Sequence, residues 1–550
     1  MERYRLPGAY LQVRCSEAQV NKRVALYSNR AGDEAYTNDD EDRRSFVVCV
    51  PAAQCPLRVY DPQMYHTAVC ASRVTFPDGV HGKLYYRGYD VEELVASAAG
   101  ASFEEVAFLL INGELPDAAA LAQWRELLLS HTFLHEDILA QLRTIRHDAH
   151  PMGSLISAVS ALSTFHPEAN PALRGASLYA ESEEARNKQV YRLLGKVATI
   201  AACVWRAKIG RSFVPPCTVY GEGDNSERNA VSYVGNFLRM LDGFVPHAAL
   251  VSIVERAWIV LADDGLNCAT GALRHVASSG ADPYVCVGTA MAAMYGERIS
   301  GVGKAVIRML EELHAHVQHA RLPSAEAERD CIAAYVDARY KRPRRRLQGF
   351  GHVNYKQYDP RARVLKQLCL EACQLFEDPE PLLQRALQLE EVVLGDAWFA
   401  VRRVWPNVDL YLPLLLRLVG LPLEFYAVFV AVPRTAGWVA HWLEGLDDGD
   451  TRIYRPRQIY VGESEREYVG MEERVEVGGG GRTGVLPDSP SASGNRREML
   501  AANRALSRMV RSVSVYQRRS TLAEQNEEDQ PFCCQRHSRG RAAKAAPPAT

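Results

Sequence analysis

Three stretches in the second half of the chain carry a histidine, a carboxylate and several arginines. "RRRLQGFGHVNYKQYDPRARVLK" spans 344–366, "WPNVDLY" spans 405–411, and Arg434 and Arg455 follow them. A guanidinium is a planar fork that meets a carboxylate through two hydrogen bonds. A histidine and an aspartate beside several arginines therefore predict a site for a substrate with several carboxylates, since this combination is more informative than any one of these residues alone.

The glycine-rich stretch "MYGERISGVGKAVIRML", 294–310, suggests a second chemistry, phosphate binding. A phosphate loop needs its Lys directly after the second Gly, then a Ser or Thr, on a turn that leaves a strand. Here two residues separate Gly301 from Lys304, Ala305 follows, and the preceding residues have a helical pattern. The stretch is therefore not a nucleotide-binding loop.

The composition excludes several classes of protein. Sixty-four Lys and Arg against 66 Asp and Glu give a net charge of −2 over 550 residues, so no basic field favours nucleic acid or an anionic membrane. Thirteen scattered cysteines without a CxxC pair favour reduced intracellular thiols. His314, His316 and His319 lack metal-site spacing, so no metal is expected.

The chain is predicted to be mainly helical from about residue 88. The apolar stretch 410–433 contains Pro413, Arg417 and Pro422, which predicts two buried helices and no membrane span. "SFEEVAFLLINGELP" begins with a capping box and ends at Gly and Pro. Further helices are expected near 151–165, 184–208, 229–263, 280–296, 302–320, 324–340, 360–376, 382–404, 408–432 and 437–446.

Long ordered motifs resemble the citrate synthase family over about 56–470. They include "HPMGSLISAVSALSTFHPEANPAL", "RNKQVYRLLGKVATIAA", "GFGHVNYKQYDPRAR", "PNVDLY", "RTAGWVAHW" and "YRPRQIYVG". The resemblance implies a mainly α fold with a large and a small helical domain. It also implies a Claisen-type condensation of an acyl-CoA, acetyl or longer, with oxaloacetate, giving citrate or an alkylcitrate and CoA. The CoA thioester is a substrate, and no cofactor is implied.

The family organisation divides the chain into five expected segments. These are a β-containing N-terminal extension over 1–75, the first part of the large helical domain over 76–300, a small helical domain with a CoA-binding turn over 301–405, the return of the large domain over 406–470, and a mostly disordered tail over 471–550. Glycine-rich and polar composition supports the last segment.

The resemblance assigns roles to matching residues. Asp409 would take the α-proton of the acyl-CoA, and His352 would polarise the ketone of the oxo acid. The carboxylates of the oxo acid would be bound by Arg361, Arg434 and Arg455, with Arg455 reaching in from the other subunit of a homodimer, and by Asn267. The adenine and phosphates of CoA would meet Gly349, Phe350, Gly351 and Lys356.

Three family positions are replaced. The catalytic His of the family's Gly-Pro-Leu-His-Gly-Gly-x-Asn turn falls on Ile299, and two further histidines fall on Leu261 and Asp264. Losing one oxyanion donor costs about 2.7–4 kcal/mol. An Asp264 carboxylate roughly 4 Å from a substrate carboxylate would add about 4 kcal/mol of repulsion, unless Asp264 is protonated or paired with an arginine. Arg298 and Ser300, beside Ile299, are candidate replacement donors.

Two functions stay open on these grounds. The retained Asp409, His352 and arginines favour an enzyme, whereas Ile299 and Asp264 favour a ligand-binding or regulatory homologue. A decaying gene is a third interpretation, although the replaced turn keeps its length and its glycines. The compartment also stays open among cytosol, mitochondrion and peroxisome.

Overall fold

A computed structural model describes the fold for residues 64, 67–96, 101–217, 232–341, 345–376, 380–449, 452–456 and 467–473. The chain divides into two units, Met1–Arg73 and Val74–Thr550, and every element named below belongs to the second. Nearly all of the expected N-terminal extension and of the expected tail lies outside the described residues, so those two predictions stay untested.

A small antiparallel sheet opens the second unit. Strands β1 (Thr75–Asp78), β2 (Lys83–Tyr86) and β3 (Tyr89–Asp90) pair in the order β1-β2-β3. Side chains alternate across a strand, and in β2 this alternation buries Leu84 and Tyr86 on one face. The sheet therefore presents Tyr86 to the helical core.

Helix α3 (Phe103–Asn112) confirms the predicted capping box. The Ser102 hydroxyl accepts the Glu105 N–H, and the Glu105 carboxylate accepts the Ser102 N–H. The helix ends at Gly113, whose φ of 92° lies in the left-handed region that glycine adopts without strain. Local sequence alone sets both ends of this helix.

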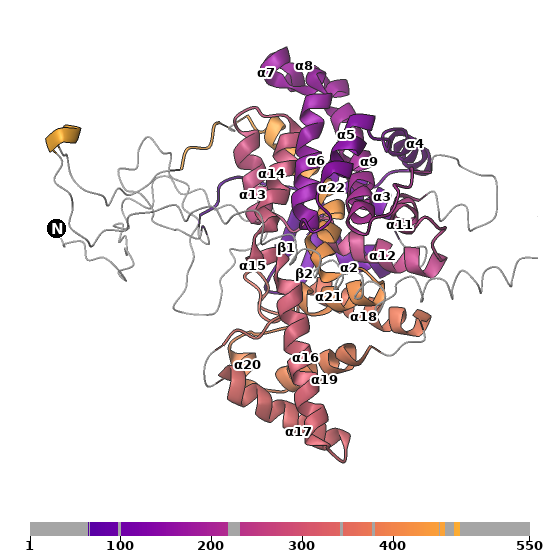
Figure 1. The fold of residues 1–550 in the computed structure, drawn as a ribbon, viewed down its shortest axis with the longest axis vertical. Helices are drawn as coiled ribbons and strands as arrows, with labels where there is room; N and C mark the ends of the chain where they lie inside the picture. Colours follow the sequence, from indigo (N-terminus) through magenta and orange to yellow (C-terminus); the bar gives the residue numbers. More distant parts are fainter. Residues whose placement is uncertain are drawn as a thin grey trace, which may run out of the picture. The chain divides into compact units, whose positions relative to one another are not determined.

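Four long helices form the centre of the second unit. They are α6 (Pro151–Phe165), α9 (Glu183–Lys208), α14 (Pro283–Tyr295) and α22 (Tyr426–Asp447), which pack against one another (Figure 1). Every residue of α22 from Tyr426 to Trp442 is buried, as expected for a helix that is apolar on all sides.

An aromatic cluster joins four helices at this centre. Trp258 on α12 (Ala248–Leu261) lies with its ring centroid 5.5 Å from that of Phe103, 4.8 Å from that of Phe237 and 6.0 Å from that of Phe429. Edge-to-face and tilted ring pairs at such distances are favourable beyond the area they bury. This packing stabilises the part of the core that carries the α12–α13 loop.

A second group of helices lies at the lower end of the view in Figure 1. It contains α16 (Val302–Ala320), α17 (Ala325–Val336), α19 (Pro381–Leu394) and α20 (Ala397–Val401). Helix α21 (Val408–Leu418) packs on both α16 and α19, and also on α18 (Pro360–Phe376). The start of α21 therefore lies where this group meets the central helices.

The remaining elements are short or connect the two groups. The other helices and turns are α2 (Val91–Ala96), α4 (Ala118–Ser130), α5 (Glu136–Thr144), η1 (Pro167–Ala169), α7 (Pro171–Arg174), α8 (Leu178–Glu181), α11 (Tyr233–Asp242), α13 (Cys268–Ala277), α15 (Glu297–Ser300), the π-helical η2 (Asp337–Lys341), η3 (Leu423–Phe425) and η4 (Met471–Glu473). No helix in the described ranges combines the length and the apolar character needed to cross a membrane.

Several predicted helix boundaries were wrong. The helix expected over 229–263 is interrupted in its described part, because Gly243 adopts a φ of 91° and ends α11. The helix expected over 382–404 is broken at Gly395, after which Asp396 caps α20. The break expected within 410–433 is confirmed, since α21 ends at Leu418. The helix expected over 437–446 is not separate but belongs to α22.

Candidate active site

The backbone segments 349–351 and 405–407 pair in an antiparallel bridge, which brings His352 near Asp409. The Gly351 N–H donates to the Trp405 carbonyl at 2.7 Å, and the Asn407 N–H donates to the Gly349 carbonyl at 3.0 Å. Both glycines have positive φ, 77° and 79°. A Cβ on Gly349 would lie 2.9 Å from the Leu410 Cα, so only glycine permits this approach.

Asp409 lies in the first turn of α21. Its N–H donates to the side chain of the capping Asn407 at 2.9 Å, and its Oδ1 accepts the Tyr426 hydroxyl at 2.6 Å. Burial raises the pKa of Asp409 above its ordinary value, although the Tyr426 hydrogen bond and the charge of Arg361 act in the opposite direction. A carboxylate with a raised pKa is a stronger base, suited to removing a proton from carbon.

His352 is held as a neutral imidazole. Its Nδ1 accepts the N–H groups of Asn354 and Tyr355 at 3.2 and 3.4 Å, so its proton is on Nε2. Burial, followed by the charge of Arg361, lowers the pKa of His352. Nε2 lies 3.3 Å from Arg361 Nη2, and both atoms are donors in this tautomer. A substrate oxygen within hydrogen-bonding distance of both nitrogens would accept from both.

Arg361 is buried and bound by two carboxylates of the chain itself. It donates from Nε and Nη2 to Asp359 at 3.0 and 2.9 Å, and from Nη1 to Asp264 at 2.6 Å. Asp359 also accepts the N–H groups of Arg361 and Val408, which ties the start of α18 to the start of α21. This network sets the position of the guanidinium.

Asp264 lies between Arg361 and Arg434. Its Oδ2 is 4.0 Å from Arg434 Nη1 and accepts the Asn267 side-chain N–H at 3.2 Å. Burial alone would raise the pKa of Asp264, but the charges of Arg361 and Arg434 outweigh it and hold the pKa at about 2. Asp264 is therefore ionised at neutral pH and paired with an arginine, one of the two conditions that the sequence left open.

Arg434 is a buried cation on α22. Its Nε donates to the Leu261 carbonyl at 2.7 Å, which orients the guanidinium toward Asp264. The Leu261 side chain belongs to the core and makes no polar contribution. Asn267 caps α13 by accepting the N–H groups of Ala269 and Thr270.

A buried ion pair supports the loop that carries Asp264. His441 Nε2 lies 3.1 Å from Asp263 Oδ2, and both side chains are inaccessible to solvent. Although burial would lower it, the charge of Asp263 raises the pKa of His441 to about 9. The Tyr86 hydroxyl donates to the Asp263 carbonyl and accepts its N–H. The small sheet and α22 together therefore position this loop.

The turn at 296–304 carries no free donor from Ser300. Its hydroxyl donates to the carbonyls of Tyr295 and Gly296, at 2.8 and 3.2 Å, inside the turn itself. Ile299 is partly buried against the core, and Arg298 is exposed. A Cβ on Gly303 would lie 3.0 Å from the Tyr426 ring, so the glycine leaves room for that tyrosine.

The predicted CoA-binding residues lie at one edge of the site. Phe350 is only 2% exposed, and Lys356 and the neighbouring Arg345 and Arg346 are exposed. Lys356 Nζ donates to the Val353 carbonyl at 3.2 Å. The basic side chains therefore stand in solvent beside the Gly349–Gly351 turn.

Arg455 does not join the other two arginines within one chain. The Tyr454 N–H donates to Ser278 at 3.0 Å, and the Tyr454 ring packs on His275. These contacts lie at the C-terminal end of α13, whereas Asn267 caps its N-terminal end. Ten helical residues span about 15 Å, so Tyr454, the neighbour of Arg455, lies about that far along α13 from Asn267.

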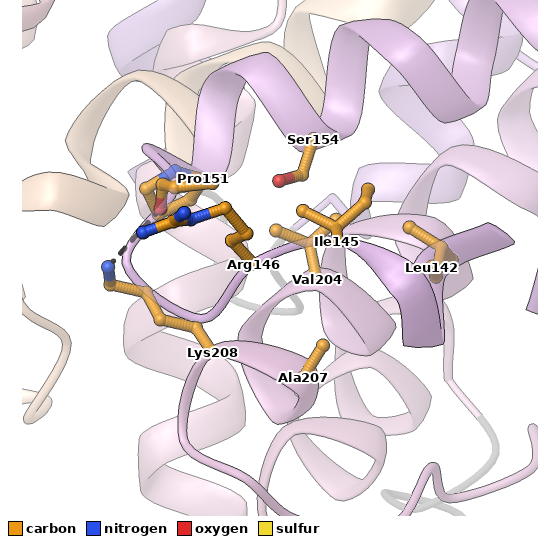
Figure 2. A pocket seen from close by; sticks show the side chains of 9 residues that line it. Leu142, Ile145, Arg146, Pro151, Ser154, Val204, Ala207 and Lys208 are labelled. Carbon is orange, nitrogen blue, oxygen red and sulfur yellow. Dashed lines mark hydrogen bonds between the residues drawn. The ribbon is translucent and has the colours of Figure 1, made fainter. Parts of the chain in front are cut away.

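A small cavity lies away from these residues. It lies between the α5–α6 connection and the end of α9, where Ile145, Pro151 and Val204 line it and Lys208 donates to the Ala149 carbonyl (Figure 2). Its volume is about 10 Å³, which is enough for one water molecule at most. It cannot hold a substrate.

The described residues contain no group of three or more His, Cys, Asp and Glu side chains that could hold a metal ion.

Comparison with known proteins gives the class to which this fold and site belong. The family model "Citrate synthase, C-terminal domain" matches residues 63–457. A crystal structure of citrate synthase from Pyrobaculum aerophilum superposes with a TM-score of 0.65 at 28% identity, covering 74% of this chain and 94% of that one. A citrate synthase from Thermotoga maritima superposes with a TM-score of 0.60 at 27% identity, covering 75% and 99%.

Curated relatives agree with this class. Peroxisomal citrate synthase of Dictyostelium discoideum is 43% identical over 425 residues, 76% of this chain and 80% of that protein. Glyoxysomal citrate synthase of Cucurbita maxima is 39% identical over 446 residues, 80% of each chain. The chain belongs to the citrate synthase family, and its mainly helical fold confirms the expected fold class.

Three residues of the site were missed by sequence reasoning: Tyr426, Asp359 and His441. Asp359 had a signal, because an aspartate before Pro360 is typical of a helix start. Tyr426 had a weaker one, since the predicted break at 420–422 brings the start of the next helix back toward Asp409. No spacing pattern links His441 to Asp263, which is 178 residues away.

Proposed function

We propose that the protein is a condensing acyltransferase that joins an acyl-CoA to oxaloacetate or a related 2-oxo acid. The observation that carries this proposal is the half-buried carboxylate of Asp409, whose pKa is raised and whose electrostatic neighbours include His352 and Arg361. Family membership supports the transferase chemistry. A carboxylate in this state serves to remove a proton from a carbon next to a thioester carbonyl.

In the first step Asp409 accepts a proton from the α-carbon of the thioester. The electron pair of that C–H bond moves toward the thioester oxygen, which becomes enolate-like. A donor close to this oxygen stabilises it, and the role is open because Ile299 has no polar atom. The Tyr426 hydroxyl, 2.6 Å from Asp409 Oδ1, is the best-placed described group. Once Asp409 is protonated, this hydroxyl can donate to the enolate oxygen instead.

In the second step the enolate carbon attacks the ketone carbon of the oxo acid. The neutral His352 donates from Nε2 to the ketone oxygen as a C–C bond forms and the C=O π bond breaks. Arg361 Nη2, 3.3 Å from that nitrogen, supports the developing negative charge. Water then cleaves the thioester and releases CoA as a thiol.

The acyl group is acetyl or a longer chain. Lys356, Arg345 and Arg346 are exposed beside the Gly349–Gly351 turn, as cations that bind phosphates of CoA would be. A longer acyl chain would give an alkylcitrate-type product. A panel of thioesters of increasing chain length distinguishes these possibilities.

The active form proposed here is a homodimer. Arg455 is exposed, and its neighbour Tyr454 contacts the far end of α13 from Asn267, which supports a role for Arg455 outside the site of its own chain. An exposed arginine in this place is available to the site of a second copy.

The direct test is release of CoA, followed with a thiol reagent, from purified protein given oxo acids and acyl-CoAs from acetyl to long-chain. Asp409→Asn and His352→Ala should each lower turnover by about 10²–10⁴, since each removes a positioned proton-transfer or donor group. Turnover unaffected by either substitution would rule out this mechanism.

The second candidate is a ligand-binding homologue without turnover. Ile299 in place of the family's catalytic histidine and the Asp264 carboxylate between two arginines favour it. Calorimetric binding of CoA or an oxo acid, together with no thiol release from any thioester in the panel, would establish this alternative.

A further inference from the structure

Asp264 places a carboxylate of the chain on the arginines that would bind the substrate. Three of the five N–H groups of Arg361 donate to Asp359 and Asp264. The carboxylate of Asp264 is 2.6 Å from Arg361 and 4.0 Å from Arg434, with its side chain only 16% exposed. Arg361 therefore has no open pair of parallel N–H groups for a second, external carboxylate.

The charges around the acceptor site no longer suit a dianion. The cations are Arg361 and Arg434, and the carboxylates are Asp264 and Asp359, with Asp409 a third when it is ionised. His352 is neutral there. Within one chain two positive charges thus face at least two negative ones, and Arg455 of a second copy would add one more, so a dicarboxylate would meet at most one excess positive charge.

We propose that Asp264 is a specificity residue that occupies the subsite of one substrate carboxylate, so that the acceptor is a 2-oxo acid with a single carboxylate. This inference rests on the proposed function. The Asp264 carboxylate occupies the place that a second carboxylate of the acceptor would take. Together with Asp359 it already neutralises the charge of Arg361.

The remaining groups match such an acceptor. Arg434 uses Nε on the Leu261 carbonyl and its Nη1 lies 4.0 Å from Asp264, so its Nη2 would donate to the single carboxylate of the acceptor. The donors of His352 and Arg361, 3.3 Å apart, receive the ketone or aldehyde oxygen. Condensation of such an acid with an acyl-CoA forms one C–C bond and gives, after thioester hydrolysis, a hydroxy dicarboxylic acid and CoA.

The test compares glyoxylate, pyruvate and oxaloacetate as ligands and as acceptors, with wild-type protein and Asp264→Asn. Binding is measured by isothermal titration calorimetry, and turnover by CoA release. Wild-type protein should prefer the monocarboxylates. Removing the charge of Asp264 should improve oxaloacetate binding by about 10²–10³-fold and change binding of the monocarboxylates much less, since a unit charge about 4 Å away is lost.

Glu424→Gln is the matched control. Glu424 is a carboxylate in η3, just before α22, that pairs with Lys304 at 3.0 Å and not with Arg361 or Arg434. The Glu424→Gln variant should bind glyoxylate, pyruvate and oxaloacetate in the same order of affinity as wild-type protein. Equal oxaloacetate affinity in wild-type protein and Asp264→Asn would overturn the acceptor class alone. Failure of both proteins to bind any of the three acids would overturn the proposed function as well.

Discussion

At the scale of single residues, the proposed chemistry depends on Asp409 and on the hydroxyl group that it accepts a hydrogen bond from. Asp409 is the carboxylate expected from "WPNVDLY" and is half-buried, whereas its contact with Tyr426 was unexpected. Burial raises the pKa of Asp409, and the hydrogen bond from the Tyr426 hydroxyl lowers it. The working pH of the site therefore depends on a residue that the sequence did not single out.

Tyr426→Phe should move the acid limb of the pH–rate profile to higher pH. Asp409 must be ionised to accept a proton, and loss of the hydrogen bond raises its pKa further. The same change should lower kcat by about 10²-fold if the hydroxyl also stabilises the enolate oxygen. The measurement is kcat and kcat/KM between pH 5 and 9.

Tyr411→Phe is the control for this prediction. Tyr411 is a buried tyrosine on α21 whose hydroxyl donates to Glu390 and not to Asp409. It loses a hydroxyl of the same kind, so it should lower stability without shifting the profile. A shift of equal size in both variants would contradict the role of Tyr426.

Gly349→Ala should lower kcat strongly, by more than its loss of unfolding free energy would account for. The added Cβ meets the Leu410 Cα at 2.9 Å and displaces the start of α21, where Asp409 lies. A displacement of about 1 Å at a reacting group costs up to about 10²-fold in rate. Steady-state kinetics together with thermal unfolding separate the two effects.

Gly88→Ala provides the comparison for the backbone cost alone. Gly88 has a φ of 94°, and a Cβ there would meet no atom within 4 Å. It should lose about 1–2 kcal/mol of unfolding free energy and keep its kcat. A comparable loss of kcat would show that Gly349 acts through general destabilisation.

At the scale of elements, the ion pair between His441 on α22 and Asp263 in the α12–α13 loop ties the site to the core. The pKa of His441 is raised from 6.5 to about 9, and Glu444 lies 3.8 Å from its other nitrogen. The folded chain therefore holds a proton on His441 at neutral pH that the unfolded chain loses near pH 6.5.

The free energy of unfolding should consequently fall as pH rises from about 6.5 to 9. A raised histidine pKa stabilises the fold fully below the unfolded value and loses this effect as pH passes the folded value. The contribution reaches about 3 kcal/mol at its maximum. Denaturant unfolding at half-unit pH intervals measures it.

The double substitution His441→Gln with Asp263→Asn should remove this pH-dependent contribution. Lys196, whose pKa burial lowers to about 8, contributes with the opposite sign and is present in both proteins. His441→Gln alone should cost about 3–5 kcal/mol, because it leaves Asp263 buried without its partner. An unchanged slope in the double variant would contradict the assignment.

Helix types were predicted well from sequence, and helix ends less well. Ser102, Glu105 and Gly113 determine α3 through contacts a few residues apart. Gly243 and Gly395 each end a helix that was expected to continue, Gly243 with a φ of 91° and Gly395 with a φ of −77°. The fusion of 437–446 with α22 despite Pro433 depended on burial from all sides.

At the scale of the whole molecule, the prediction is a homodimer. Light scattering at micromolar concentration should give twice the 61.2 kDa mass of the chain. Mixing inactive Asp409→Asn with inactive Arg455→Ala, under conditions that exchange subunits, should restore part of the activity, because one site per mixed dimer then has both residues. A monomer, or no recovery, would contradict the role given to Arg455.

The sequence by itself determined the family and the helical class, and it singled out Asp409, His352, Arg361 and Arg434 as candidates, because these depend on ordered motifs and local patterns. Tertiary structure alone decided what those residues meet: Tyr426 on Asp409, and Asp264 on Arg361. Such contacts join residues 17 and 97 positions apart. Charge pairing and burial depend on distance in space, and a linear sequence does not contain that distance.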